Sequence, residues 1–160
     1  MDNPQKTAAF DIPAFIARNT KTKRYPEISA SANTLKSTYP KVGAIGYCYG
    51  AWAVFRLGAS PSTIDAISAA HPSLLETHEM DGVSVPVQIL APEKDVAFTQ
   101  ELKEYANRVL PTRGVPYEYV FFPGVKHGFA ARGNSGDEVQ RASLERAKRC
   151  AVGFFKEFLH

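Results

Sequence analysis

Short apolar runs alternate with helix-like segments along most of this chain. Four runs that suit buried strands occupy residues 42–47, 64–70, 85–91 and 117–122. Segments with helical spacing of apolar residues lie between them, at 49–58 and 100–110. Strands that alternate with helices pair in parallel and bury both faces of their sheet. The pattern therefore predicts an α/β fold, a parallel sheet flanked by helices.

The segments before and after these runs predict further helices. Pro26 suits the first position of a helix, where its missing N–H has no intrahelical partner, and residues 20–24 resemble a surface loop. Ser135 and Glu138 have capping-box spacing and predict the start of a long amphipathic helix. We expect its buried stripe to contain Val139, Ala147, Cys150, Ala151, Phe154 and Phe158.

The length of 160 residues fits a single domain. We expect an irregular segment plus one helix over residues 1–41, and the sheet with its helices over 42–160. No strand-like run precedes residue 42, so the predicted sheet has about four strands and one bare edge. This edge would favour a homodimer or aggregation.

The charge balance argues against a nucleic-acid partner. Lys and Arg number 19 and Asp and Glu 16, which leaves a net charge of +3 with no basic stripe. No run approaches the ~18 consecutive apolar residues of a membrane helix, and the first ten residues lack the apolar centre of a signal peptide. We expect a cytoplasmic protein without a membrane partner.

Cysteine and histidine spacing argues against a metal site or a disulfide framework. Cys48 and Cys150 are too few for a framework and lack the CxxC spacing of zinc or redox sites. A proline and a loop separate His71 from His78, which makes a shared metal ion improbable. We expect both cysteines to be reduced thiols.

Three residues of complementary chemistry follow three different predicted strands. Cys48 follows the run 42–47, Asp95 follows 85–91, and His127 follows 117–122. The carboxyl ends of parallel strands meet at one edge of a sheet, where active sites form. Taken singly, each residue has an ordinary structural explanation in tight packing, turn formation or capping. Their order along the chain, nucleophile, acid and histidine, is more specific.

Cys48 lies within Gly46-Tyr47-Cys48-Tyr49-Gly50, where a strand runs directly into a helix. This is the nucleophile-elbow pattern with Cys in place of Ser, in which small residues let the strand and helix pass closely. A helix N-terminus favours the thiolate, and the N–H of Tyr49 would face a developing oxyanion. His127 would then act as general base and acid, oriented by Asp95.

The chain resembles the dienelactone hydrolase family, a cysteine-nucleophile branch of the α/β-hydrolases. The resemblance rests on the stretches GAIGYCYGAW, ISAAHPSLL, VPVQILAPEKD and FFPGVKHGFAAR. It implies hydrolysis of small esters or lactones without a metal or organic cofactor, with Cys48 as nucleophile, Asp95 as acid and His127 as base. It also implies that the chain corresponds to the C-terminal portion of the family. The family's preceding strands normally supply a second oxyanion donor and a glutamate near the cysteine.

Three further residues are candidates for substrate contact. Arg132 follows the histidine, as a carboxylate-binding arginine does in some members of the family, although a plain surface arginine has the same pattern. His71 follows a predicted strand and would line the site or bond within its loop. Tyr47 precedes the nucleophile and would shape the mouth of the site.

Because the second oxyanion donor would be missing, we expect an esterase of low activity. Two other functions compete with this one. A non-catalytic remnant that serves as an interaction module would retain the three residues but lack half of the site. A redox-sensing thiol at Cys48 would be oxidised readily because a low-pKa, exposed cysteine reacts with peroxide.

Overall fold

The computed structural model describes residues 11–132 and 136–160. Four parallel strands form one sheet in the order β1-β2-β3-β4. Their bounds are Gly43–Tyr47 for β1, Ala66–Ala70 for β2, Val87–Lys94 for β3 and Tyr117–Lys126 for β4. Each strand overlaps one of the four apolar runs, so the predicted α/β architecture is confirmed.

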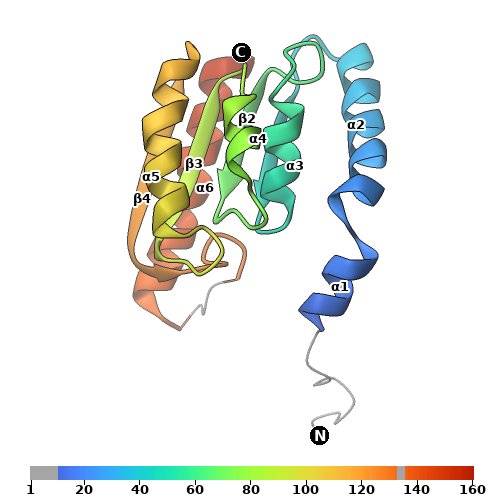
Figure 1. Cartoon of the computed structure of the whole chain (residues 1–160). Helices are drawn as coiled ribbons and strands as arrows, with labels where there is room; N and C mark the ends of the chain where they lie inside the picture. Colours follow the sequence, from blue (N-terminus) through green and yellow to red (C-terminus); the bar gives the residue numbers. More distant parts are fainter. Residues whose placement is uncertain (1–10, 133–135) are drawn as a thin grey trace, which may run out of the picture.

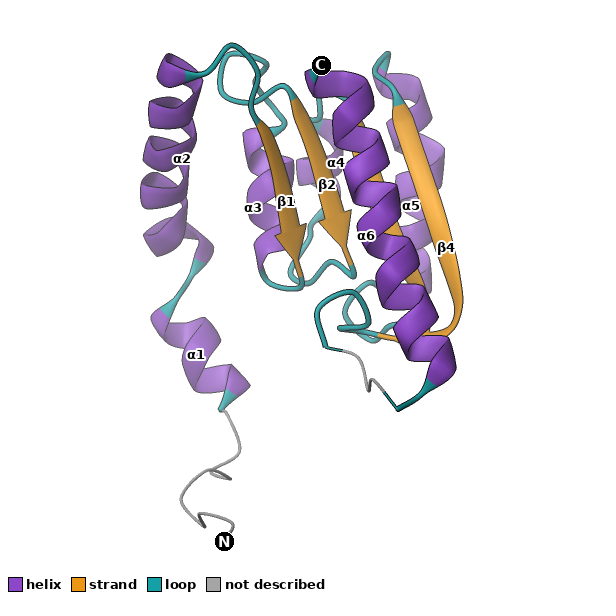
Figure 2. Ribbon diagram, turned by 180° about the vertical axis from the view of Figure 1, so that it is seen from behind, coloured by secondary structure: helices purple, strands orange, loops and turns teal. Residues whose placement is uncertain are grey.

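Helices cover both faces of this sheet. The crossovers between successive neighbouring strands place α3 (Gly50–Leu57), α4 (Thr77–Asp81) and α5 (Gln100–Val109) on one face, as Figure 1 shows. A 3₁₀ turn (Leu110–Arg113) extends α5. The C-terminal helix α6 (Glu138–Leu159) crosses the opposite face (Figure 2).

Each covered face has its own hydrophobic core. The larger core lies under α3 and α5 and includes Phe55, Ile67, Ile89 and Phe98, all fully buried. The smaller core lies under α6 and is built from Ala70, Leu90, Val120, Phe122, Val125, Phe129, Ala147 and Ala151. Burial on both faces holds the central strands β2 and β3 rigidly, which fixes the loops at their carboxyl ends.

Two helices precede the sheet, α1 (Ile12–Arg18) and α2 (Lys21–Thr38). The expectation of a loop at 20–24 with Pro26 starting the helix is wrong. Thr20 caps α2 by accepting from the N–H of Lys23, and Pro26 lies inside the helix, where it removes one backbone hydrogen bond.

Ion pairs explain why α2 begins so early. Lys21, the first residue of the helix, donates to both carboxylate oxygens of Glu79, at 2.9 and 3.0 Å, and also pairs with Glu76. The Glu79 side chain is 1% exposed and also accepts from Arg56 of α3. Through these ion pairs the buried carboxylate holds the first turn of α2 against α3 and α4. The ion pairs offset the loss of the backbone hydrogen bond at Pro26.

The start of α6 differs from the expected capping box. Ser135 lies outside the described residues, and the cap is Asp137, whose carboxylate accepts from the N–H of Gln140 at 3.1 Å. Val139 is 54% exposed rather than part of the buried stripe, because it lies in the first turn, beyond the edge of the core. Ala147, Ala151 and Phe154 are buried as expected.

The outer edge of β1 has no neighbouring strand among the described residues, as its terminal place in the sheet order requires. Ile45 and Tyr47 of this strand are 37% and 40% exposed. Within the described part of the chain, every helix is too short or too polar to cross a bilayer.

Candidate active site

Cys48 directly follows β1 and has left-handed backbone geometry, with φ of 51°. This conformation costs a non-glycine residue about 1–3 kcal/mol and is typical of functional sites. The Cys48 N–H donates to the carbonyl of Ala70 and its own carbonyl accepts from Ala51 and Ser73, which hold the turn in place. The strand therefore runs into α3 through a sharp elbow with the sulfur at its tip.

Gly46 and Gly50 contribute differently to the elbow. A Cβ atom on Gly46 would lie 2.4 Å from the carbonyl oxygen of Gly50 and 2.9 Å from the Cα of Ala51, so only glycine lets the strand pass the helix. A Cβ atom on Gly50 would meet nothing within 4 Å. The close-approach explanation thus holds for Gly46 and is wrong for Gly50.

Asp95 and His127 lie side by side because β3 and β4 extend further than the apolar pattern indicated. Lys94 pairs with Lys126 after a register shift that follows Pro92. Asp95 and His127 are the first residues after β3 and β4, and the His127 N–H donates to the carbonyl of Lys94 at 3.1 Å. The extended pairing brings the two side chains to the same edge of the sheet as Cys48.

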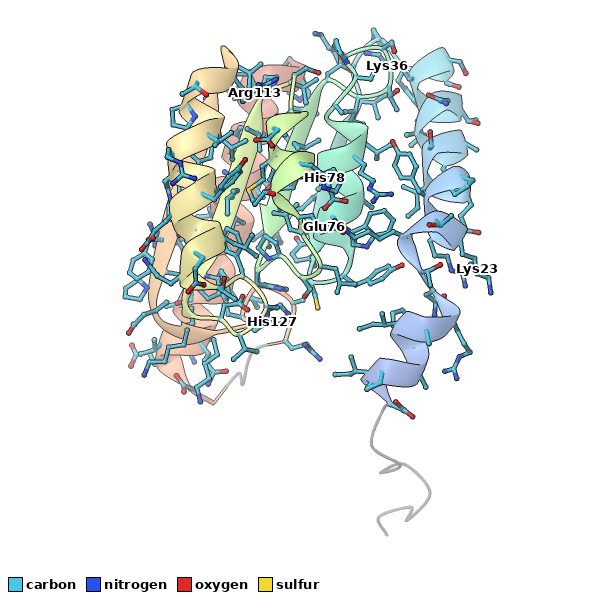
Figure 3. The ribbon with its side chains drawn as sticks, in the orientation of Figure 1. Lys23, Lys36, Glu76, His78, Arg113 and His127 are labelled. Atoms are coloured by element: carbon cyan, nitrogen blue, oxygen red, sulfur yellow. The ribbon has the colours of Figure 1, made fainter. Side chains whose placement is uncertain are left out.

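A continuous hydrogen-bonded chain joins the three predicted residues. Nε2 of His127 lies 3.0 Å from Sγ of Cys48, and Nδ1 lies 2.9 and 2.8 Å from the two carboxylate oxygens of Asp95. Asp95 also accepts from the N–H groups of Ala97 and Phe98. Figure 3 shows His127 at the carboxyl-terminal edge of the sheet, at the same end of the molecule as α1.

These contacts shift the acidity of all three groups. The hydrogen bond to His127, with a smaller contribution from the hydroxyl of Ser73, lowers the pKa of Cys48 from 9.0 to about 5. Hydrogen bonds to Asp95 and Cys48 raise the pKa of His127 from 6.5 to about 9. Burial would raise the pKa of Asp95, but the bonds from His127 and two backbone N–H groups hold it below its ordinary value. At neutral pH the pair is a thiolate and an imidazolium.

Ser73 is a site residue that the sequence did not reveal. Its hydroxyl oxygen lies 3.3 Å from Sγ of Cys48 and 3.3 Å from Nε2 of His127. The β2–α4 loop presents Ser73 through left-handed backbone at His71 (φ 38°) and Leu74 (φ 57°). Cys48, Ser73 and His127 therefore form a triangle of polar side chains.

His71 lies directly beneath this triangle. The ring is fully buried and packs edge-to-face on His127, with centroids 5.0 Å apart, and on Phe129. Neither ring nitrogen has a hydrogen-bond partner among the described residues, so the expected bonding within the loop is absent there.

A cavity of about 590 Å³ opens over the sulfur. Cys48, Ser73 and His127 lie on its wall with Tyr49 and Arg132, and the rest of its lining is apolar, from Ile12, Phe15, Ile16, Leu74, Leu75, Val96 and Ala97. Tyr47 lines a different cavity, on the α6 side of the sheet. Of the candidate substrate contacts, Arg132 thus faces the cavity, while His71 lies behind it and Tyr47 apart from it.

No group of three or more His, Cys, Asp or Glu side chains within residues 11–132 and 136–160 is arranged as metal ligands are. The ionisable groups at the sheet edge instead pair with one another. A thiol, an imidazole and a carboxylate joined in this order are the groups that acyl transfer by a triad uses.

A parallel sheet with a strained elbow after one strand, and with an acid and a histidine after two others, defines the α/β-hydrolase fold class. The family model for the dienelactone hydrolase family matches residues 2–159, and the chain belongs to that family. The resemblance seen in the sequence is confirmed.

Known relatives are hydrolases by name. The chain is 32% identical over 136 residues to the hydrolase tropI of Talaromyces stipitatus, covering 84% of this chain and 53% of that protein. It is 24% identical to the human carboxymethylenebutenolidase homolog, covering 92% of this chain and 62% of the homolog. The chain therefore spans between half and two thirds of the length of these curated relatives.

Solved structures of low sequence identity share the fold. A dienelactone hydrolase from Anabaena variabilis superposes with a TM-score of 0.62 at 17% identity, over 92% of this chain and 68% of that one. A dienelactone hydrolase-like promiscuous phosphotriesterase from metagenomic libraries gives a TM-score of 0.75 at 17% identity, over 95% and 69%.

Proposed function

We propose that this chain hydrolyses carboxylic esters or lactones, with Cys48 as the nucleophile. One observation carries the proposal: the unbroken chain from Sγ of Cys48 through His127 to Asp95, whose sulfur faces an open cavity. A nucleophile, a base within hydrogen-bond reach and a group that orients the base are the parts that acyl transfer needs. Membership of a hydrolase family supports the same reaction.

In the first half of the reaction, the thiolate attacks the carbonyl carbon and forms a C–S bond. The carbonyl electron pair moves to oxygen and returns when the C–O bond to the alcohol breaks. The imidazolium of His127 gives its Nε2 proton to the departing oxygen. A thioester on Cys48 and a neutral His127 remain, and in a lactone the alcohol stays attached to the acyl group.

Water completes the cycle. His127 takes a proton from a water molecule, whose oxygen attacks the thioester carbonyl. The C–S bond then breaks, which releases the carboxylic acid and restores the thiolate beside the imidazolium. Asp95 fixes the ring orientation through Nδ1 and stays ionised throughout, in line with its lowered pKa.

The developing oxyanion needs hydrogen-bond donors. Tyr49 precedes the first residue of α3, so its N–H lies at a helix N-terminus beside the sulfur. Loss of one oxyanion donor lowers kcat by about 100- to 1000-fold. We assign one donor, Tyr49, in the described part of the chain and expect slow turnover.

Arg132 would select substrates that carry an anionic group. It lines the cavity, and no carboxylate among the described residues forms an ion pair with it. A guanidinium binds a carboxylate through two parallel hydrogen bonds. An ester or lactone that also carries a carboxylate is therefore a suitable substrate, and a reducing cytoplasm would preserve the Cys48 thiol.

Steady-state hydrolysis of nitrophenyl acetate tests the proposal. We expect turnover by the wild type, loss of turnover in Cys48→Ala, and no change in Cys150→Ala, whose cysteine lies on α6 away from the cavity. An acid quench during turnover should trap a mass increase of one acetyl group on Cys48. Wild-type rates equal to those of buffer would contradict the proposal.

The exposed edge of β1 favours one alternative, an interaction module without turnover. The low pKa of Cys48 favours another, a redox-sensing thiol. A folded wild type that turns over no ester but gains oxygen mass on Cys48 with peroxide would indicate the second.

A further inference from the structure

The cavity over Cys48 is larger and more apolar than a small ester requires. Its volume of about 590 Å³ lies within the range of cavities that enclose drug-sized ligands. Val96 lines the cavity and is 94% exposed. Leu74, whose backbone is left-handed, lines the cavity as well. Burial of these solvent-facing apolar side chains against an apolar ligand would contribute favourably to the free energy of binding.

The helix α1 forms one apolar wall of this cavity. Ile12, Phe15 and Ile16 share one helical face at i, i+3 and i+4 spacing, and all three line the cavity. No residue of α1 is buried, and Ile12 is 57% exposed. The helix therefore contributes its apolar face to the cavity rather than to either core.

Contacts with the nucleophile elbow hold α1 in this position. The Phe15 ring packs edge-to-face on Tyr49, with centroids 5.5 Å apart. The Tyr49 hydroxyl donates to the carbonyl of Asn19, and the Asn19 side chain donates to the carbonyl of Phe15 and accepts from Arg24. The residue that follows Cys48 thus connects the elbow to the wall.

The chemistry determines which part of the substrate meets this wall. The leaving oxygen must lie near Nε2 of His127 to receive its proton. The acyl group then extends away from His127. His127 and the α1 residues Ile12, Phe15 and Ile16 both line the cavity, and Figure 3 shows His127 at the edge of the sheet with α1 lying beside it as a separate element.

We infer that the acyl part of the substrate is an apolar chain or ring, hexanoyl to octanoyl in size or aryl, that lies against α1. The inference rests on the proposed function and adds a substrate class to it. Each buried methylene contributes up to about fourfold to binding. Apolar contact made in the transition state therefore raises kcat/KM with acyl length until the cavity is filled.

A series of nitrophenyl esters from acetate through butyrate and hexanoate to octanoate tests the inference. We expect kcat/KM of the wild type to rise by at least about tenfold from acetate to octanoate. The double variant Ile12→Ala/Ile16→Ala should lower the octanoate-to-acetate ratio, because it removes apolar surface while the Phe15–Tyr49 contact stays. Ile12→Leu/Ile16→Leu should restore the ratio.

Leu35→Ala is the matched control, since Leu35 is a 47% exposed apolar residue of α2 outside the cavity lining. It should leave the ratio unchanged. A wild type that prefers acetate, or a double variant with the wild-type ratio, would overturn the inference and leave the proposed function intact.

A second readout separates the two ideas if no ester is turned over. Neutral amides compete for the cavity without reacting, so octanamide should slow alkylation of Cys48 by iodoacetamide in the wild type more than acetamide does. The double variant should lose this protection. If no ester is turned over but octanamide protects Cys48 better than acetamide does, the proposed function alone is rejected. If the two amides slow alkylation equally, the inference is rejected.

Discussion

The sulfur of Cys48 is surrounded by three side chains with different tasks. His127 provides the charge that holds the thiolate, Ser73 supplies a neutral hydroxyl at 3.3 Å, and the buried ring of His71 packs against His127. Asp95 reaches the sulfur only through His127, whose Nδ1 it contacts with both carboxylate oxygens. The acidity of the thiol and the position of the base therefore depend on the same few contacts.

The thiolate–imidazolium pair predicts a wide pH range for thiol reactivity. The lowered pKa of Cys48 means that the thiolate is present above about pH 5 and is lost as pH falls further. The raised pKa of His127 means that the imidazolium is present below about pH 9 and is lost as pH rises. In a Cys150→Ser background, alkylation by iodoacetamide should show a midpoint near pH 5.

His127→Ala should move that midpoint upward, toward the ordinary value of a free thiol. The pH profile of kcat/KM should be bell-shaped, with its limbs near the same two values. A wild-type midpoint above pH 8, typical of an unperturbed cysteine, would contradict the ion pair.

Ser73 offers a finer test at the residue scale. Its hydroxyl hydrogen bond to the thiolate favours the charged form, so Ser73→Ala should raise the alkylation midpoint by about one pH unit. At neutral pH the alkylation rate should change little, because the thiolate still predominates. Ser84→Ala, which removes a hydroxyl bonded to Gly58, is the control and should not move the midpoint.

The site residues differ in how readily the sequence reveals them. Cys48, Asp95 and His127 each follow a strand, so apolar patterning and the rule for parallel sheets were enough to predict them together. His71 was also a candidate because it follows a predicted strand, whereas Ser73 reaches the site through a loop whose left-handed residues carry no distinctive sequence signal. Their contacts depend on tertiary packing that periodicity does not encode.

At the scale of elements, the ends of β3 and β4 decide where the acid and the histidine lie. Lys103 of α5 is buried, and its ammonium donates to the carbonyls of Pro92 and Glu93 at 2.7 and 2.9 Å. Glu93 in turn accepts from the N–H of Gly124 on β4. These bonds hold the irregular pairing that precedes Asp95.

Lys103→Met should therefore weaken both stability and positioning. Two carbonyls would lose a charged donor, at a cost of about 1–3 kcal/mol in unfolding free energy. If Asp95 shifts, His127 loses its orientation, and kcat should fall more than KM rises. Lys23→Met on α2, which replaces an exposed lysine, is the control for thermal melting and kinetics. A variant with a lower melting temperature but the wild-type kcat per folded molecule would show that Lys103 acts on stability alone.

The same region shows why boundaries were harder to predict than elements. The apolar runs end at 91 and 122, and the strands continue through Pro92, Glu93, Pro123 and Gly124, residues that usually interrupt strands. Lys103 of α5 and the hydrogen bond from Gly124 to Glu93 stabilise that extension, and the local apolar pattern of neither strand reveals these contacts. Pro26 is a parallel case, since the buried Glu79 holds the first turn of α2 against the proline's local preference.

At the scale of the whole molecule, β1 is both the strand that leads into Cys48 and, among the described residues, an edge strand of the sheet. Its outer side has no strand partner in the described ranges, 11–132 and 136–160. An exposed edge next to apolar side chains pairs readily with other chains. Among the described residues, β2 is the one strand that pairs with β1, so the position of Cys48 depends on this pairing and on the helices packed against β1.

We expect the 160-residue chain to associate through this edge. Two copies related by a two-fold axis would pair their β1 strands antiparallel and join the two sheets into one. The nucleophile elbows would then lie at opposite ends of the joined strands, so each cavity would stay open. Light scattering coupled to size exclusion should show a mass that rises from monomer toward dimer with concentration.

Ile45→Lys should suppress this association, since a charged side chain at an edge strand disfavours pairing. Leu35→Lys, at a comparably exposed apolar residue on α2, should leave association unchanged. Because β1 carries Cys48, pairing should also slow local opening of the strand, and backbone amide exchange of residues 43–47 should fall with concentration. A wild type that stays monomeric at every concentration, with unchanged exchange in β1, would show that the edge is protected without a partner.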